Sequence, residues 1–179
     1  MLDSKNAVLV IIDVQGKLAQ IMHDRDNLFR NLHILVSGIK LLNIPIIWME
    51  QVPDKLGPTI PEIKDVLIDQ KPITKDVFSC AKNEKFNNTI NKINPKDIIL
   101  AGIESHICVY QTAMDLLEKN HNVHIVTDAI SSRISKNKEL GIERMLLEGA
   151  MQTSVEMLLF EMQGEAKGER FRQISKLVK

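Results

Sequence analysis

Runs of apolar residues alternate along the chain with stretches in which apolar residues recur every three or four positions. The first run, 7–12, is apolar at every position and ends at Asp13. A strand that is apolar on both sides is typical of a parallel sheet covered by helices on each face. Comparable apolar runs predict further strands over 44–49, 97–101, 123–127 and 151–153.

Helical periodicity fills the intervals between these strands. Leu28, Leu32, Leu35 and Ile39 follow three- and four-residue spacing, which predicts a helix over 25–42. Comparable patterns predict helices over 83–93, 107–119, 136–148 and 155–162, with a terminal helical segment ending at 179. Prolines and glycine indicate a loop-rich passage over 51–72 with one helical turn, and the loop extends to Lys75.

The alternation of strands and helices predicts an α/β fold. Its expected form is a three-layer α/β/α sandwich with a mainly parallel sheet, built as a single domain over residues 1–179. Hydrophobic residues make up 44% of the 179, which is enough for a packed core and argues against disorder.

Charge and hydropathy exclude several classes of partner. Lys plus Arg equals Asp plus Glu at 23 each, so there is no net charge to attract nucleic acid or an anionic membrane surface. No stretch approaches the roughly 20 apolar residues of a membrane helix, and the polar start lacks a secretory signal. We therefore expect a cytoplasmic protein whose cysteines, Cys80 and Cys108, are free thiols.

The predicted strand ends are where ligands bind in folds of this class. Three polar features fall there: Asp13, the segment 102–108, and Asp128, which closes its strand. Cys108 is expected at a helix start, whose free amides stabilise a thiolate and can hold an oxyanion. A buried cysteine is also often an inert apolar residue, and a carboxylate at the end of a strand is often a helix or turn cap. Spacing alone therefore leaves both a catalytic and a structural interpretation open.

Three short stretches together resemble the signatures of isochorismatase-like cysteine hydrolases. They are Ile11-Ile12-Asp13-Val14-Gln15, Lys75 followed by Phe78-Ser79, and Ala101-Gly102-Ile103-Glu104-Ser105-His106-Ile107-Cys108-Val109. The likeness covers essentially the whole chain. The segments 50–59 and 128–133 are most similar to the isochorismatase domain-containing proteins of bacteria and eukaryotes.

The resemblance implies a role for each signature residue. Asp13 would act as general acid–base, Lys75 would favour and position the charged groups, and Cys108 would attack the substrate and form a covalent intermediate. A cis peptide between Ile103 and Glu104 would bring the Glu104 amide beside the Cys108 amide as an oxyanion hole. The expected activity is hydrolysis of a small amide, ureide or related carbonyl compound.

The chain departs from some relatives in ways that affect the site. Nicotinamidases of the superfamily hold a metal through an Asp-x-His pair, where this chain has Gln51-Val52-Pro53, so we expect neither metal nor other cofactor. Leu18 stands where many relatives carry an aromatic residue over a flat substrate. Gln15, Leu18, Gln51 and Ile107 are the candidate pocket residues, although either glutamine equally suits hydrogen bonding to loop backbone.

The remaining candidates have simpler interpretations. Cys80 is expected to be structural rather than a redox partner, Trp48 to belong to the core, and His106 to face a loop or subunit contact. Asp128 is expected to cap or support the loop 129–133. The resemblance also implies a homo-oligomer, a dimer or larger. Two alternative functions stay open: a nuclease-type activity, and a non-catalytic metabolite-binding or scaffold protein.

Overall fold

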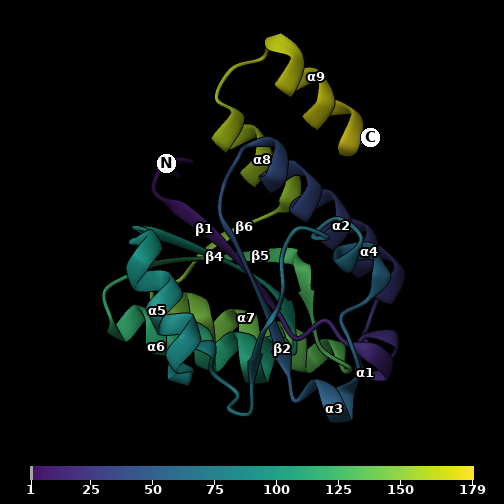
Figure 1. Ribbon diagram of the computed structural model, residues 1–179, viewed down its shortest axis with the longest axis vertical. Helices are drawn as coiled ribbons and strands as arrows, with labels where there is room; N and C mark the ends of the chain where they lie inside the picture. The colour runs from purple at the N-terminus through teal and green to yellow at the C-terminus, as the bar shows by residue number, and fades with distance from the viewer. Residues whose placement is uncertain (1) are drawn as a thin grey trace.

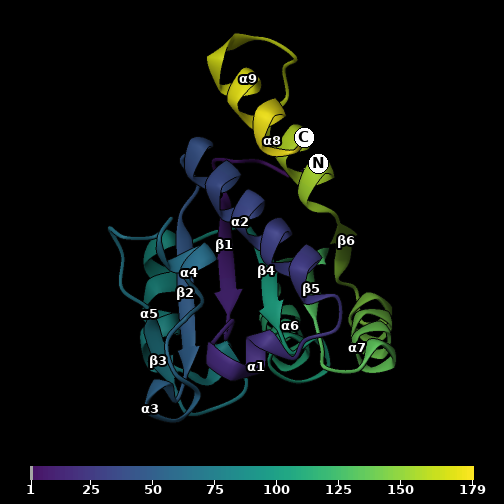
Figure 2. The ribbon, with the colours of Figure 1, turned by 90° about the vertical axis from the view of Figure 1, so that its right-hand side faces the viewer.

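The computed structural model describes residues 2–179, and its sheet has six strands, all paired in parallel. The strands lie in the order β3-β2-β1-β4-β5-β6, and their carboxyl ends point toward α1 and α3 (Figure 2). Their bounds are β1 Ala7–Ile12, β2 Ile46–Gln51, β3 Ile73–Lys75, β4 Asp97–Ile103, β5 Asn122–Ser131 and β6 Met151–Thr153.

Helices cover both faces of this sheet, which confirms the predicted three-layer α/β fold. Helices α2, α4 and α8 lie on one side, while α5, α6 and α7 lie on the other (Figure 1). The helices are α1 Gly16–Gln20, α2 Arg25–Leu41, α3 Pro53–Leu56, α4 Pro61–Lys64, α5 Glu84–Ile93, α6 Tyr110–Glu118, α7 Ser135–Leu147, α8 Val155–Gln163 and α9 Gly168–Leu177, with a 3-10 turn at Cys80–Lys82 and a π-helical turn at Ser105–Val109.

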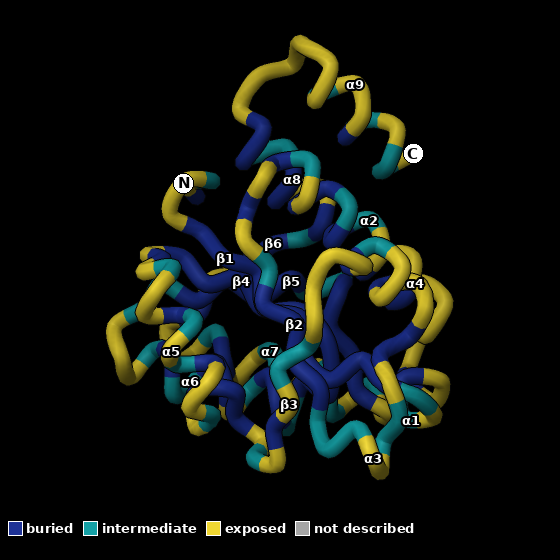
Figure 3. The backbone as a smooth tube through the Cα atoms, in the orientation of Figure 1, coloured by how far each residue is buried: buried dark blue, intermediate teal, exposed yellow. Residues whose placement is uncertain are grey.

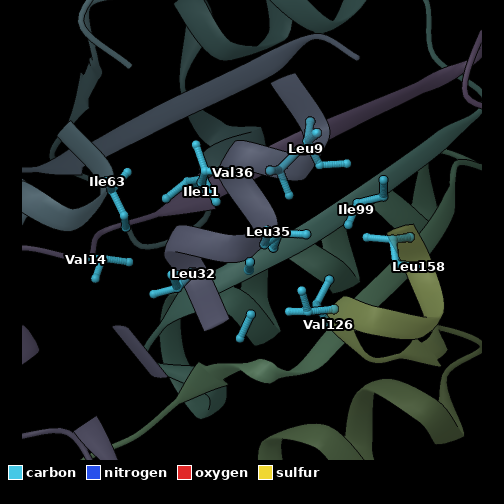
Figure 4. Packing of buried hydrophobic residues seen from close by; sticks show 14 of the residues in the cluster. Leu9, Ile11, Val14, Leu32, Leu35, Val36, Ile63, Ile99, Val126 and Leu158 are labelled. Carbon is cyan, nitrogen blue, oxygen red and sulfur yellow. The ribbon is translucent and has the colours of Figure 1, made fainter. Parts of the chain in front are cut away.

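The two faces of β1 explain why its sequence is apolar throughout. Leu9 and Ile11 pack with Leu32 and Leu35 of α2, and alternate residues such as Val10 face the helices of the other layer (Figure 4). Because strand side chains alternate between faces, each layer receives every second residue. The central strands β1 and β4 are accordingly buried at every position, whereas α9 is largely exposed (Figure 3).

The strand order creates a divergence between β1 and β4. The chain moves outward from β1 to β2 and β3, with α2 on one face, and then returns past β1 to β4, with α5 on the other face. At such a switch point the connections leave neighbouring strands in opposite directions and open a crevice at their carboxyl ends. Asp13 directly follows β1 and Cys108 follows β4, so both lie beyond the carboxyl ends of the two strands where the connections diverge.

Several strands differ from their predicted extent because of pairing with neighbours. Strand β2, predicted over 44–49, runs instead from Ile46 to Gln51, where it pairs with β1 and β3. Lys75, expected in a loop, ends the short edge strand β3 and lies opposite Gln51 of β2. The sequence predicts that strand β4 breaks at Gly102, but the strand continues to Ile103. A Cβ at Gly102 would lie 2.1 Å from the Ile12 backbone oxygen, so the glycine permits a close approach to β1 and does not end the strand.

The prediction that Asp128 closes its strand is also wrong. Strand β5 continues to Ser131, because a register shift between Leu100 and Gly102 allows the later part of β5 to pair with the end of β4. The Asp128 side chain instead accepts a hydrogen bond from the Val155 backbone nitrogen at 2.9 Å. It therefore caps the start of α8 and not the loop 129–133. No helix among residues 2–179 is long and apolar enough to cross a membrane.

Candidate active site

A buried ion pair joins the ends of β1 and β3. Asp13 adopts a left-handed conformation with φ of 54° directly after β1, and its carboxylate Oδ2 lies 2.6 Å from Lys75 Nζ. Lys75 also donates to Gln51 Oε1 at 2.6 Å and to the backbone oxygens of Val77 and Phe78 at 3.1 and 3.0 Å. An ammonium group has three donors, so these four acceptors use its full capacity.

The second carboxylate oxygen of Asp13 is in a different situation. Among residues 2–179, Asp13 Oδ1 is the buried side-chain polar atom that has no hydrogen-bond partner. The Cys108 thiol lies beside this carboxylate, and the interaction of the two groups affects the pKa of each. Burial raises the pKa of Asp13, although the Lys75 ammonium and the Cys108 thiol act in the opposite direction. The carboxylate that interacts with the Cys108 thiol therefore also carries a buried oxygen whose hydrogen-bonding capacity is not used.

Cys108 is held in the π-helical turn between β4 and α6. The turn packs tightly against α7, since a Cβ at Gly141 would lie 2.6 Å from Ser105 Oγ, and Ser105 Oγ donates to the Lys138 backbone oxygen at 3.0 Å. Burial raises the pKa of the Cys108 thiol, and the nearby charge of Asp13 raises it further, against the smaller opposing effect of Lys75. These effects favour the protonated thiol, so attack by Cys108 would need a base, the role that the resemblance implies for Asp13.

The segment before Cys108 carries a cis peptide between Ile103 and Glu104. The Glu104 side chain is buried, and its carboxylate accepts the Arg133 backbone nitrogen at 2.9 Å and the Arg133 Nε at 3.2 Å. These bonds join the end of β4 to the segment after β5. The Glu104 carboxylate is bonded to Arg133, and its carbonyl oxygen accepts the backbone nitrogens of Ile107 and Val109, which leaves the backbone N–H as the group of this residue that could serve the site.

The two candidate glutamines have different roles. Gln15 is fully buried: its Oε1 accepts the Gln51 backbone nitrogen at 2.6 Å, and its Nε2 donates to the Gly57 and Gln51 backbone oxygens at 2.7 and 3.2 Å. It therefore satisfies loop backbone, which is one of the two interpretations that its sequence position allows. Gln51 instead directs its Oε1 to Lys75. The parallel register that places Gln51 opposite Lys75 is not visible in the sequence.

The other predicted residues have packing roles in the described structure. Leu18 packs against the apolar cluster around α2, and Ile107 packs against the cluster that contains Cys108. Trp48 is buried and donates to Thr59 Oγ1 at 2.7 Å. His106 Nδ1 lies 2.9 Å from Ser132 Oγ, a loop contact. The Cys80 thiol is fully buried, which raises its pKa to about 12.

The chain is similar in sequence to proteins of a known family. The family model of the isochorismatase domain matches residues 7–157. The chain is 37% identical over 178 residues to a protein of Phytophthora sojae named secreted isochorismatase effector Isc1, covering 97% of this chain and 85% of that one. It is 35% identical over 177 residues to isochorismatase domain-containing protein 2 of Danio rerio, covering 99% and 89%.

Solved structures show the same fold. The structure described as the MAR1 ribonuclease of Caenorhabditis elegans superposes with a TM-score of 0.91 at 33% identity, covering 99% of this chain and 91% of that one. The YcaC gene product of Escherichia coli, described as an octameric hydrolase of unknown specificity, gives a TM-score of 0.92 at 23% identity, covering 98% and 88%. The second likeness concerns the fold alone.

Proposed function

The chain belongs to the isochorismatase family, and from that premise we propose that it is a metal-independent cysteine hydrolase of small amides, ureides or related carbonyl compounds. Membership makes it an isochorismatase-like hydrolase. The observation that carries the finer proposal is the Asp13 carboxylate, which lies beside the Cys108 thiol and has a buried oxygen, Oδ1, without a hydrogen-bond partner. A base without a donor next to a nucleophile that must lose a proton is the arrangement that thiol attack requires.

In the proposed reaction, Asp13 Oδ1 takes the thiol proton while the Cys108 sulfur bonds to the substrate carbonyl carbon. The backbone amides of Glu104 and Cys108 would hold the resulting oxyanion. Asp13 then gives the proton to the leaving nitrogen, the C–N bond breaks, and a thioester forms. Water attacks the thioester with Asp13 as base, which releases the acid and returns the proton to the sulfur.

Lys75 supports this cycle through Asp13. A buried carboxylate gains a proton easily, and the adjacent ammonium opposes this by stabilising the charged, basic form. Because the four acceptors around Nζ occupy its donors, Lys75 acts on the carboxylate and not on the substrate. Lys75 is therefore a positioning residue, whereas Asp13 and Cys108 meet the reacting atoms.

The oligomeric state, the location and the alternative of an RNA substrate complete the proposal. We also propose a homo-oligomer, as the family resemblance implies; the octamer is described for the Escherichia coli protein. We propose a single hydrolase domain that acts in the cytoplasm, whereas the Phytophthora sojae relative is named as secreted. The ribonuclease description of the Caenorhabditis elegans structure is the reason to test RNA, but zero net charge gives this chain little attraction for a polyanion.

The test is capture of the covalent intermediate by intact-protein mass spectrometry. Wild-type protein is mixed with a panel of small amides and ureides and quenched in acid, with a labelled single-stranded RNA assayed alongside. We expect an acyl adduct on Cys108 and release of the amine. Cys108→Ala should lose both, whereas Cys80→Ala, which removes the other thiol, should retain both. Equal turnover by Cys108→Ala, or cleavage of RNA without any adduct, would refute the proposal.

A further inference from the structure

The orientation of the Gln51 side-chain amide is fixed by Lys75. Gln51 Oε1 lies 2.6 Å from Lys75 Nζ, and an ammonium group only donates hydrogen bonds, so the oxygen of the amide must face it. The amide nitrogen, Nε2, therefore points away from Lys75. Gln51 is half-buried at the end of β2, the strand next to β1, beside the carboxyl end from which Asp13 emerges.

The two donors on Nε2 are free in the described part of the chain. Gln51 Nε2 donates no hydrogen bond to another of the residues 2–179, and the atom is not among the fully buried polar atoms that lack a partner. The Lys75 ammonium has no donor left, because four acceptors surround it within 3.1 Å. On this side of the site, Gln51 Nε2 is thus the side-chain donor that remains for a bound molecule.

Resting on the proposed hydrolase function, we infer that Gln51 determines specificity by donating a hydrogen bond from Nε2 to a neutral oxygen of the substrate. The acceptor would be a carbonyl or hydroxyl oxygen, as in a small amide or ureide. Lys75 would then serve two groups at once, holding Asp13 through one donor and orienting Gln51 through another.

The charges around the site favour a neutral substrate over an anionic one. Lys75 is balanced by Asp13, and Glu50 is also buried, with its Oε1 accepting both the backbone nitrogen and the hydroxyl of Thr59 at 2.8 Å. The charge of Glu50 contributes to raising the pKa of Asp13, which shows that its field reaches the site. With Glu104 paired to Arg133, the site has three negative groups, Asp13, Glu50 and Glu104, against two positive ones, so a carboxylate substrate would meet one excess negative charge.

The first experiment compares alkylation of Cys108 by two neutral reagents, iodoacetamide, which has an amide oxygen, and allyl iodide, which has no acceptor. Both rates are measured by mass spectrometry in wild type, Gln51→Glu and Gln51→Met. In Gln51→Glu, the carboxylate keeps an oxygen for Lys75 but has no N–H donor. We expect the ratio of iodoacetamide to allyl iodide rates to fall about tenfold in both variants, the effect of about one neutral hydrogen bond. Gln70→Glu, at an exposed position, should leave the ratio unchanged.

A fall of both rates by the same factor would mean that Gln51 serves Lys75 alone, and it would overturn the inference. An unchanged ratio would overturn it equally. If Cys108 reacts with neither reagent, the hydrolase proposal itself is contradicted, and a second measurement then decides the role of Gln51.

That measurement follows the side-chain NH2 signals of Gln51 in ¹H–¹⁵N spectra of Cys108→Ala, assigned by their loss in Gln51→Glu. Titration with acetamide should shift these signals saturably, and acetate should shift them at least tenfold less at the same concentration. No shift with acetamide, or an equal shift with acetate, would refute the inferred neutral oxygen acceptor without bearing on Cys108 as nucleophile.

Discussion

Lys75 Nζ and Asp13 Oδ2 lie 2.6 Å apart, with 0% and 2% of the two side chains exposed. The partners are 62 positions apart in sequence and belong to the edge strand β3 and the turn after the central strand β1. Removing one partner of such a buried pair leaves an uncompensated charge, which is far more costly than replacing both.

Lys75→Met is therefore expected to lower the free energy of unfolding by about 3–5 kcal/mol at pH 7. The double variant Asp13→Asn/Lys75→Met should recover much of that loss, because no buried charge remains. Urea denaturation of both variants and wild type measures the effect. A second readout is the pH dependence of Cys108 alkylation. Lys75 opposes the rise in the pKa of Asp13, so Asp13 should bind its proton at a higher pH in Lys75→Met. The acid limb of the alkylation profile should then move to higher pH as well. Stability within about 1 kcal/mol of wild type would contradict the importance of this pair.

Gly102→Ala should be strongly destabilising because of the contact between β4 and β1. The added Cβ would lie 2.1 Å from the Ile12 oxygen and 2.7 Å from its nitrogen. We expect a loss of roughly 3 kcal/mol or more from overpacking and backbone strain together. Gly149→Ala is the matched control, since Gly149 also has a positive φ, of 103°, but a Cβ added there would meet nothing within 4 Å. Similar losses in urea denaturation would mean that φ alone sets the cost.

Cys80 should make stability fall at alkaline pH. Burial raises its pKa from 9.0 to about 12, so above pH 9 the unfolded chain loses a proton that the folded protein keeps. The stabilisation that the folded protein gains from keeping the Cys80 thiol protonated is fully present below pH 9. It is lost toward pH 12, at about 1.4 kcal/mol of unfolding free energy per pH unit. The difference in unfolding free energy between wild type and Cys80→Ala, followed in urea from pH 8.5 to 10.5, should change by that slope. A constant difference would show that the folded thiol ionises freely.

Chelation is expected to leave the activity unchanged. In the stretch where nicotinamidases carry metal ligands, this chain places Gln51, whose Oε1 is bonded to Lys75, followed by Val52 and Pro53. Turnover of the best amide substrate is measured after dialysis against EDTA and after addition of zinc. Loss of turnover that zinc restores would refute the metal-independent assignment, whereas loss through unfolding would be visible by circular dichroism.

Several features followed from local sequence alone. The apolar pattern of 7–12 predicts a strand covered on both sides, and the spacing in 25–42 predicts the long helix α2, because burial imposes a period of two or 3.6 on the chain. The positions of Asp13 and Cys108 beyond β1 and β4 follow from the same alternation. The wrong strand ends at Gly102 and Asp128 arose because pairing with a neighbour can extend a strand past residues that normally end one.

What the tertiary structure decided is how these groups affect one another. The sequence determined the α/β class and which residues stand near the strand ends. Only the parallel register of β2 with β3 brings Gln51 opposite Lys75, and only the folded chain buries Cys108 beside the charge of Asp13, both of which raise the pKa of its thiol. Hydrogen bonds between strands and the loss of water depend on residues distant in the chain, and no local pattern encodes them.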